Sequence, residues 1–207
     1  MGRRTQKVKT RQMVLLAILT AVILVLQLTG FAIKLPFLGT SVSLVLIPIT
    51  LGAMILGPVS GGFLGFVFGA EVYIVCGVMG TDPFTAFLFQ DAPIATAGIC
   101  LIKSTLAGYL SGLTFKLLRD KSRIAATFCA AVVMPVVNTG VFILGCLLIR
   151  STLEGFMAES SIGGGVVYFL IIGCAGINFL LEAGLNLILA PALNRLWEIA
   201  SRQFRLS

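Results

Sequence analysis

The sequence predicts an all-α integral membrane protein, a bundle of six transmembrane helices with both termini in the cytoplasm. Of its 207 residues, 58% are hydrophobic and only 11% are charged, whereas about 25% of the residues in a soluble domain are charged. The apolar residues form runs of about twenty, the length of a helix that crosses a bilayer. They do not alternate with polar residues, as they do in the strands of a membrane β-barrel.

The composition excludes several classes of protein. The mean hydropathy of +1.07 excludes a soluble globular enzyme and a disordered tail. The net charge is +7, but the basic residues stand at the chain ends and in short loops beside apolar runs. This pattern is typical of a membrane protein rather than of a nucleic-acid-binding domain. The chain has no histidine, so imidazole is available neither as a metal ligand nor as a base.

Motifs for catalysis and metal binding are missing from the sequence. It contains no GxSxG, HExxH or phosphate-binding-loop pattern. The five cysteines all fall inside apolar segments, and no two form a CxxC pair, which indicates buried apolar side chains rather than disulfides or a metal site. We therefore expect no catalytic residue, no metal, no cofactor and no ATPase in this chain.

Six apolar runs define the spans of one expected transmembrane domain, which covers residues 12–200. A basic cytoplasmic segment, residues 1–11, precedes this domain, and a cytoplasmic tail, residues 201–207, follows it. The six expected spans are Gln12–Phe31, Val42–Leu56, Val59–Met79, Pro93–Leu118, Ile124–Ile149 and Val166–Leu189.

The first three spans follow from charge and from breaks in the apolar pattern. Five basic residues precede the first span, as in a signal peptide, but no small-residue cleavage site follows it, so we expect it to be retained. The second span is short, and Pro48 is expected to bend it. The Gly57-Pro58 pair is a tight break before the third span.

The last three spans are bounded by polar segments. A loop with Asp82 and Asp91 precedes the fourth span, and a charged turn over residues 119–123 ends it. A second loop, residues 150–165, separates the fifth span from the sixth. Pro191 then leads into a basic amphipathic tail.

Charge asymmetry sets the expected orientation. Twelve of the fifteen Lys and Arg residues fall on one side of the bundle: five at the N-terminus, four in residues 116–123 and three in the C-terminal tail. Cytoplasmic loops carry the excess of Lys and Arg, so both termini are expected to be cytoplasmic. An even number of spans agrees with this orientation.

Ionisable side chains inside the spans are the first candidates for a binding site. Glu71 lies on the third span, Lys103 near the middle of the fourth and Glu182 on the sixth. Charges are costly inside a bilayer and usually face the bundle interior or a wet cavity. Lys103 could instead pair with a glutamate while the asparagines bridge helices. A polar cavity that opens outward and binds a small hydrophilic or zwitterionic molecule accounts for more of these residues together.

Amide side chains extend the expected site. Asn138 lies in the outer half of the fifth span, while Asn178, Glu182 and Asn186 recur every four residues and share one face of the sixth. The residues expected to bind substrate on this reasoning are Glu71, Lys103, Asn138, Asn178 and Glu182.

Small residues recur at four-residue spacing on three spans, which lets helices approach closely. Packing within the bundle is the expected role of the stripes on the third and fourth spans, which are Gly61, Gly65 and Gly69, and Ser104, Gly108 and Gly112. Ala17 and Ala21 lie on the terminal helix, where an interface with another protein is the alternative.

In size, number of spans and location of the termini, nearly the whole chain resembles the substrate-binding S components of energy-coupling factor (ECF) vitamin transporters. Six local stretches carry the resemblance. They are residues 17–21 (AILTA), 46–49 (LIPI), 57–61 (GPVSG), 103–108 (KSTLAG), 135–140 (PVVNTG) and 186–191 (NLILAP).

The resemblance implies an activity, a location and partners. An S component binds a vitamin or a vitamin precursor near the outer face of the bacterial cell membrane. It associates with a coupling module of one transmembrane subunit and two ATPase subunits, and is thought to topple in the membrane to release its cargo. Ala17 and Ala21 match the AxxxA pattern whose helix face docks on the transmembrane coupling subunit.

The same resemblance implies that two loops cover the cargo. In this chain they are Ala32–Ser41 and Gly80–Asp91. The apolar cover would come from Phe31, Phe37, Phe84 and Phe87.

Two cargoes are favoured. Pantothenate would suit Lys103 as the partner of its carboxylate and Asn138 as the partner of its amide or hydroxyl groups. Riboflavin would prefer aromatic surfaces and amides, which Tyr73, Phe84, Tyr168 and Asn138 could supply. A cation such as thiamine would suit Glu71, but the single tryptophan, Trp197, lies at the cytoplasmic end and cannot form an indole cage around it.

Three other classes remain open. A membrane scaffold of the cell-shape type would need no cavity and would pair its intramembrane charges internally. A carrier that works alone on an ion gradient often has inverted repeats, and none is evident between residues 12–100 and 101–200. A membrane-embedded enzyme has the least support, because no catalytic motif is present.

Overall fold

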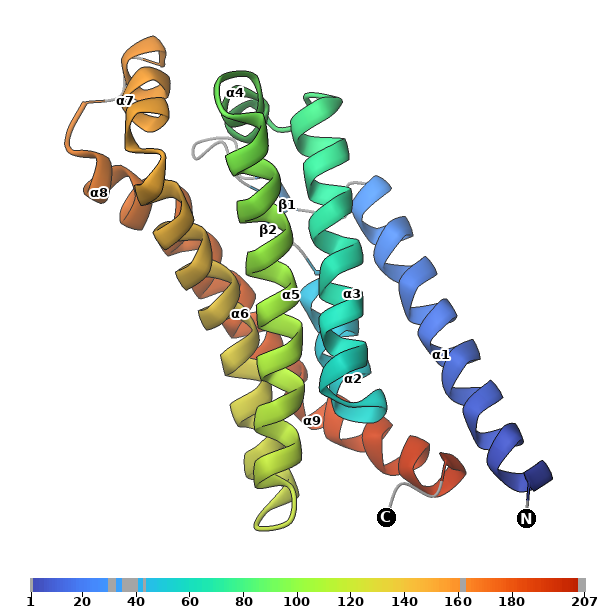
Figure 1. Ribbon diagram of the computed structural model, residues 1–207. Coiled ribbons are helices and arrows are strands. Elements are labelled where there is room, and N and C mark those ends of the chain that lie inside the picture. The colour runs from blue at the N-terminus through green and yellow to red at the C-terminus, as the bar shows by residue number, and fades with distance from the viewer. Residues whose placement is uncertain (1, 30–32, 35–40, 43, 161–162, 205–207) are drawn as a thin grey trace.

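The computed structural model describes residues 2–29, 33–34, 41–42, 44–160 and 163–204, and these form a bundle of long helices (Figure 1). Helix α1 (Gly2–Leu28) begins, and helix α9 (Ile177–Phe204) ends, at the same end of the bundle. We call this the lower end. The upper end, opposite to it, carries the short helices α4 (Pro83–Asp91) and α7 (Arg150–Glu159).

Five of the described helical segments are long and apolar enough to cross a membrane. They are Thr10–Leu28, Pro58–Val78, Pro93–Leu118, Arg123–Leu148 and Asn178–Arg202. These segments correspond to the expected first, third, fourth, fifth and sixth spans, so a multi-pass helical membrane protein is confirmed. The bounds of α5 (Pro93–Leu118) are those expected for the fourth span, and α6 (Arg123–Leu148) differs from the fifth by one residue at each end.

The expected second span is shorter in the structure than in the sequence analysis. Helix α2 covers Leu46–Leu56, eleven residues. Val42 lies instead in β2 (Ser41–Val42), which pairs antiparallel with β1 (Ile33–Lys34). Pro48 occupies the first turn of α2, where its missing N–H is not needed, so it begins the helix rather than bending it. Phe31, Phe37 and the rest of the first covering loop between the strands lie outside the described residues.

Both polar segments that were expected to be loops contain helices. Asp82 caps α4 by accepting a hydrogen bond from the Thr85 amide at 2.8 Å. Helix α7 packs against α4, and the Thr152 hydroxyl donates to the Asp91 carboxylate. Short amphipathic helices have no long apolar run, so hydropathy alone did not reveal them.

The amphipathic tail expected after Pro191 is part of α9, which continues through this proline to Phe204. Two contacts fix the lower half of α9 to the bundle. The Trp197 indole donates to the Met54 carbonyl oxygen at 3.1 Å, and Glu198 pairs with Arg123 at the start of α6. These tertiary contacts therefore stabilise α9 beyond Pro191, although a proline inside a helix usually interrupts it.

Helix α3 (Pro58–Glu71) packs directly on α5 through the small-residue stripes. A Cβ atom built on Gly65 would lie 2.0 Å from the Ser104 carbonyl oxygen, and one on Gly69 would lie 2.4 Å from that of Cys100. One on Gly108 would lie 2.1 Å from the carbonyl oxygen of Gly61. The expected role of these stripes in internal packing is confirmed, since only glycine allows such close backbone contact.

Buried apolar side chains form three clusters along the bundle. The lower cluster consists of Met54, Ile55, Phe115, Ala126, Ala130, Leu193, Trp197 and Ala200. The middle cluster consists of Leu19, Ile23, Val45, Leu46, Ile49, Leu64, Phe68, Ala107 and Met134. The upper cluster consists of Phe84, Leu88, Ile99, Cys146, Leu153, Met157, Val166, Phe169 and Leu170.

The close contact between α3 and α5 gives a stability prediction. We expect Gly65→Ala to lower the free energy of unfolding by about 1–3 kcal/mol, the usual cost of overpacking, because the new methyl group meets backbone that cannot move aside. Gly98→Ala on α5 is the matched control, since its Cβ would meet nothing within 4 Å. Thermal unfolding in detergent should show a lower midpoint for Gly65→Ala alone. Equal midpoints for the two variants would contradict the packing described.

Candidate functional site

Polar side chains stand directly above the middle cluster, one turn further toward the upper end. Glu71 follows Phe68 on α3, and Asn138 follows Met134 on α6, at spacings of three and four residues. On α5, Ser104 precedes Ala107 by three residues. Because residues at these spacings share a helix face, the interior changes from apolar to polar at this height. We call the set the polar layer; its members are Glu71, Lys103, Ser104, Asn138, Asn178 and Glu182.

Hydrogen bonds align the helices that carry the polar layer. The Ser104 hydroxyl lies 3.4 Å from Asn138 Oδ1 and connects α5 to α6. Lower down, Thr127 on α6 meets Asn194 on α9 at 3.5 Å. Since α6 and α9 run in opposite directions, this contact brings Glu182 to about the height of Asn138. Ser104, Asn138 and Glu182 are all buried.

Glu71 is buried, and no described residue donates a hydrogen bond to its carboxylate. Its side chain is 6% exposed, and neither carboxylate oxygen accepts a hydrogen bond within the described part of the chain. Two other buried oxygens, Oδ1 of Asn178 and Oδ1 of Asn186, also accept no hydrogen bond from a described residue. Buried polar atoms are nearly always hydrogen-bonded, and leaving one unpaired is costly. All four of these atoms are acceptors, so they require donors.

Lys103 also has no ionic partner among the residues that the structure describes. Its ammonium nitrogen lies over the Phe142 ring, 4.8 Å from the centroid, a favourable cation–π contact. It makes no ion pair within 4 Å with a described acidic side chain. The expected alternative, in which Lys103 pairs with a glutamate, has no matching ion pair among the described residues.

The upper cluster forms a roof over the polar layer. The Phe84 ring packs against Phe142, Phe156 and Phe169 at centroid distances of 6.2, 5.1 and 6.0 Å. Phe87 also meets Phe156, at 5.3 Å. Phe84 and Phe87 were expected in a covering loop, and the structure puts them on α4 with their rings against α7. The part played by α7 was missed in the sequence, although Leu153, Phe156 and Met157 have helical spacing there.

The two tyrosines expected near the cargo differ in their surroundings. Tyr73 packs edge-on against Phe89 of α4, with ring centroids 5.6 Å apart. Tyr168 is 65% exposed, in the three-residue helix α8 (Val166–Tyr168).

Two π-helical segments adjoin the polar layer and were not predicted. Segment η1 (Val72–Val78) begins immediately after Glu71, and η2 (Phe169–Gly176) ends two residues before Asn178. The Gln27 amide of α1 donates to the Cys76 sulfur on η1 at 3.7 Å. Such turns are rare and frequently occur at functional sites. No local sequence pattern predicts these π-helical segments, since the residues of both are also typical of an apolar α-helix.

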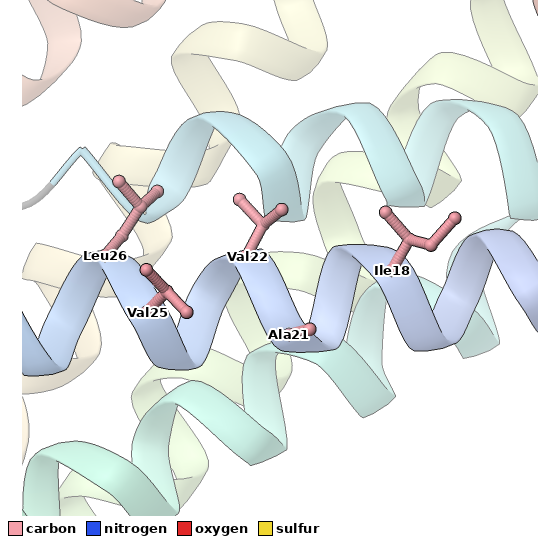
Figure 2. Close-up of a pocket in the computed structure, with 5 residues that line it drawn as sticks. All are labelled: Ile18, Ala21, Val22, Val25 and Leu26. Atoms are coloured by element: carbon pink, nitrogen blue, oxygen red, sulfur yellow. The ribbon is translucent and has the colours of Figure 1, made fainter.

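Ala17 and Ala21 lie at the centre of the face of α1 that points away from the bundle. The opposite face contributes Leu19 and Ile23 to the middle cluster. A shallow apolar hollow of about 330 Å³ runs along the exposed side; Figure 2 shows the residues that line it, which are Ile18, Ala21, Val22, Val25 and Leu26. Small side chains at its centre let another helix approach closely.

Comparison with known proteins gives one match. The family model described as "ECF transporter, substrate-specific component" matches residues 11–194. This range includes the polar layer, the roof helices and the apolar segment of α1 apart from Thr10. No curated protein matches the chain in sequence.

Proposed function

Because that family model spans most of its length, the chain belongs to the substrate-specific components of ECF transporters, and we propose that its cargo is a small water-soluble vitamin or vitamin precursor, with pantothenate or riboflavin favoured. Separate ECF subunits would supply the energy by hydrolysing ATP. The observation that carries the proposal is the polar layer between two apolar clusters, where no described residue pairs with the buried Glu71 carboxylate or with the Lys103 ammonium group.

The proposed cargo site includes Glu71, Lys103, Asn138, Asn178 and Glu182. Lys103 would pair with a cargo carboxylate, and the Asn138 amide would bond to a cargo amide or hydroxyl. Phe84 would contribute from the roof, and Tyr73 from η1, where its ring packs on Phe89 of α4. Tyr168 is exposed and is left out of the proposed site. The scaffold alternative is weakened, because a scaffold has no use for interior charges that lack partners.

We propose that the domain crosses the bacterial cell membrane six times between residues 12 and 200. Helix α2, together with the chain that precedes it, would provide the sixth crossing. Both termini, residues 1–11 and 201–207, would be cytoplasmic. The basic residues of the charged turn after α5 support this orientation, and so does the position of both termini at the lower end (Figure 1).

Thiol labelling of intact cells tests the orientation. In a background without the native cysteines, a membrane-impermeant maleimide should label Glu159→Cys at the upper end. It should label Lys121→Cys only after the membrane is permeabilised, because the positive-inside rule places that turn in the cytoplasm. Both positions are exposed in the structure. Labelling of Lys121→Cys in intact cells would overturn the proposed orientation.

We further propose that the outer face of α1 docks on the transmembrane coupling subunit. We expect Ala21→Trp to reduce co-purification of the coupling module at least about tenfold, because the indole fills the hollow and holds the partner helix away. Ile188→Trp is the matched control, an exposed apolar position on α9. Cargo binding by the isolated chain should be unaffected in both variants. Undiminished assembly of Ala21→Trp would exclude this face as the docking surface.

Mass spectrometry of small molecules released from the purified protein tests the function itself. The chain should be expressed alone in rich medium and solubilised in detergent. We expect one vitamin-sized compound at close to one molecule per chain, because buried charges gain most when a ligand pairs them. An empty protein that also gains no thermal stability from a panel of B vitamins would favour the scaffold alternative. Uptake by the chain alone in vesicles, with no ATPase present, would favour a stand-alone carrier.

A further inference from the structure

The polar layer contains Glu71 and Lys103, which have opposite charges on neighbouring helices, and the described structure contains no ion pair between them. Resting on the cargo-binding function proposed above, we propose that the cargo is an acid with hydrogen-bond donors at its other end. Its anionic group would pair with Lys103, and a hydroxyl or N–H group would donate to Glu71. Neutral cargoes and purely cationic cargoes are excluded by this arrangement.

Glu71 is the part of the polar layer that requires hydrogen-bond donors. Its carboxylate offers two buried acceptor oxygens that no described residue satisfies. The unpaired Oδ1 of Asn178 adds an acceptor near the start of α9. Among the described side chains, the unsatisfied buried atoms are thus oxygens throughout, and a cargo carboxylate placed against them would be repelled. A hydroxyl or an N–H group supplies the donors that these oxygens lack.

Lys103 is the part of the polar layer that requires an anion. Its ammonium group donates three hydrogen bonds and accepts none, and here it is held over the Phe142 ring. This contact places the ammonium group of α5 against α6. No acidic side chain described in the structure neutralises it within 4 Å. An anionic group of the cargo would do so.

Glu71 and Lys103 form no ion pair with each other in the described part of the chain. They lie on different helices, and the α3–α5 contact fixes those helices at the backbone, with the Gly65 and Gly69 positions against Ser104 and Cys100. Each charge therefore remains available to a different part of one molecule. Of the two favoured cargoes, pantothenate has this polarity, with a carboxylate at one end and hydroxyl groups at the other. Riboflavin has hydroxyl groups and no acid.

Five probes test the inference on the wild-type chain in detergent. Pantothenate has both groups; its alcohol, pantothenol, lacks the acid; nicotinate has an acid and no donor; riboflavin has hydroxyl groups and no acid; thiamine is a cation. We expect pantothenate to bind at least about tenfold more tightly than each of the others, since one charge-assisted hydrogen bond is worth that factor or more. This ranking needs no variant and does not depend on the folding of any substitution.

Two substitutions then show which residue binds the acid of pantothenate and which binds its hydroxyl groups. Lys103→Met should weaken pantothenate about 10- to 100-fold and leave pantothenol nearly unchanged, while Glu71→Gln should weaken both by a similar factor. The matched controls are Lys116→Met on α5 and Glu154→Gln on α7, both exposed, and neither should alter binding. Equal effects of Lys103→Met on pantothenate and pantothenol would overturn the inference.

The remaining outcomes separate this inference from the proposed function. If riboflavin, pantothenol, thiamine or nicotinate binds most tightly, the inferred cargo, an acid with hydrogen-bond donors at its other end, is wrong. The proposed function of vitamin binding would still stand. If no probe binds, the compound released from the purified protein decides: an acid with hydroxyl or N–H donors supports the inference, and a neutral or cationic compound overturns it. No bound probe and no released compound would overturn the proposed function as well.

Discussion

The arrangement of the bundle depends on one contact, the approach of α3 and α5 to backbone distance. Glycine at three positions of α3 removes the side chains that would separate the helices. Helix α5 then has its other side free for α6, where Ser111 donates to the Ala130 carbonyl at 2.9 Å and Ser104 meets Asn138. Three of the helices that carry the polar layer are thus fixed relative to one another before any ligand is considered. A polar side chain on such a framework cannot move toward a distant partner, which is why burial leaves Glu71 unsatisfied.

The two ends of the bundle are built differently. At the lower end the contacts are made by long helices: Trp197 bonds to Met54, packs on Phe115 at 5.4 Å and lies under the Arg123 guanidinium at 5.5 Å. At the upper end the roof consists of short helices held by ring contacts and by the Thr152–Asp91 bond. A site that fills from the upper side and stays sealed below is consistent with that difference.

How far the sequence predicted this structure depends on the range of each interaction. Long apolar runs gave the bounds of α5 and α6 almost to the residue, and the four-residue stripe gave the common face of Asn178, Glu182 and Asn186. Interactions between helices far apart in the chain could not be predicted in this way. The position of Lys103 over Phe142 depends on how α5 and α6 align, and Ser104 was assigned only to packing although it contacts Asn138. Helix α7 and the path of α9 past Pro191 were missed for the same reason, since tertiary contacts decide both.

The light packing of α1 has a consequence for how this protein can change. Only 11% of the apolar segment of α1 is buried inside the bundle, and its inner face reaches the middle cluster through a few side chains such as Leu19 and Ile23. The residues that position the polar layer lie on α3, α5, α6 and α9. Substitutions on the outer face of α1 therefore leave those positions undisturbed, and substitutions in the polar layer leave that face undisturbed. On the proposed assignments, choice of partner and choice of cargo would depend on separate parts of the chain, so each could vary without the other.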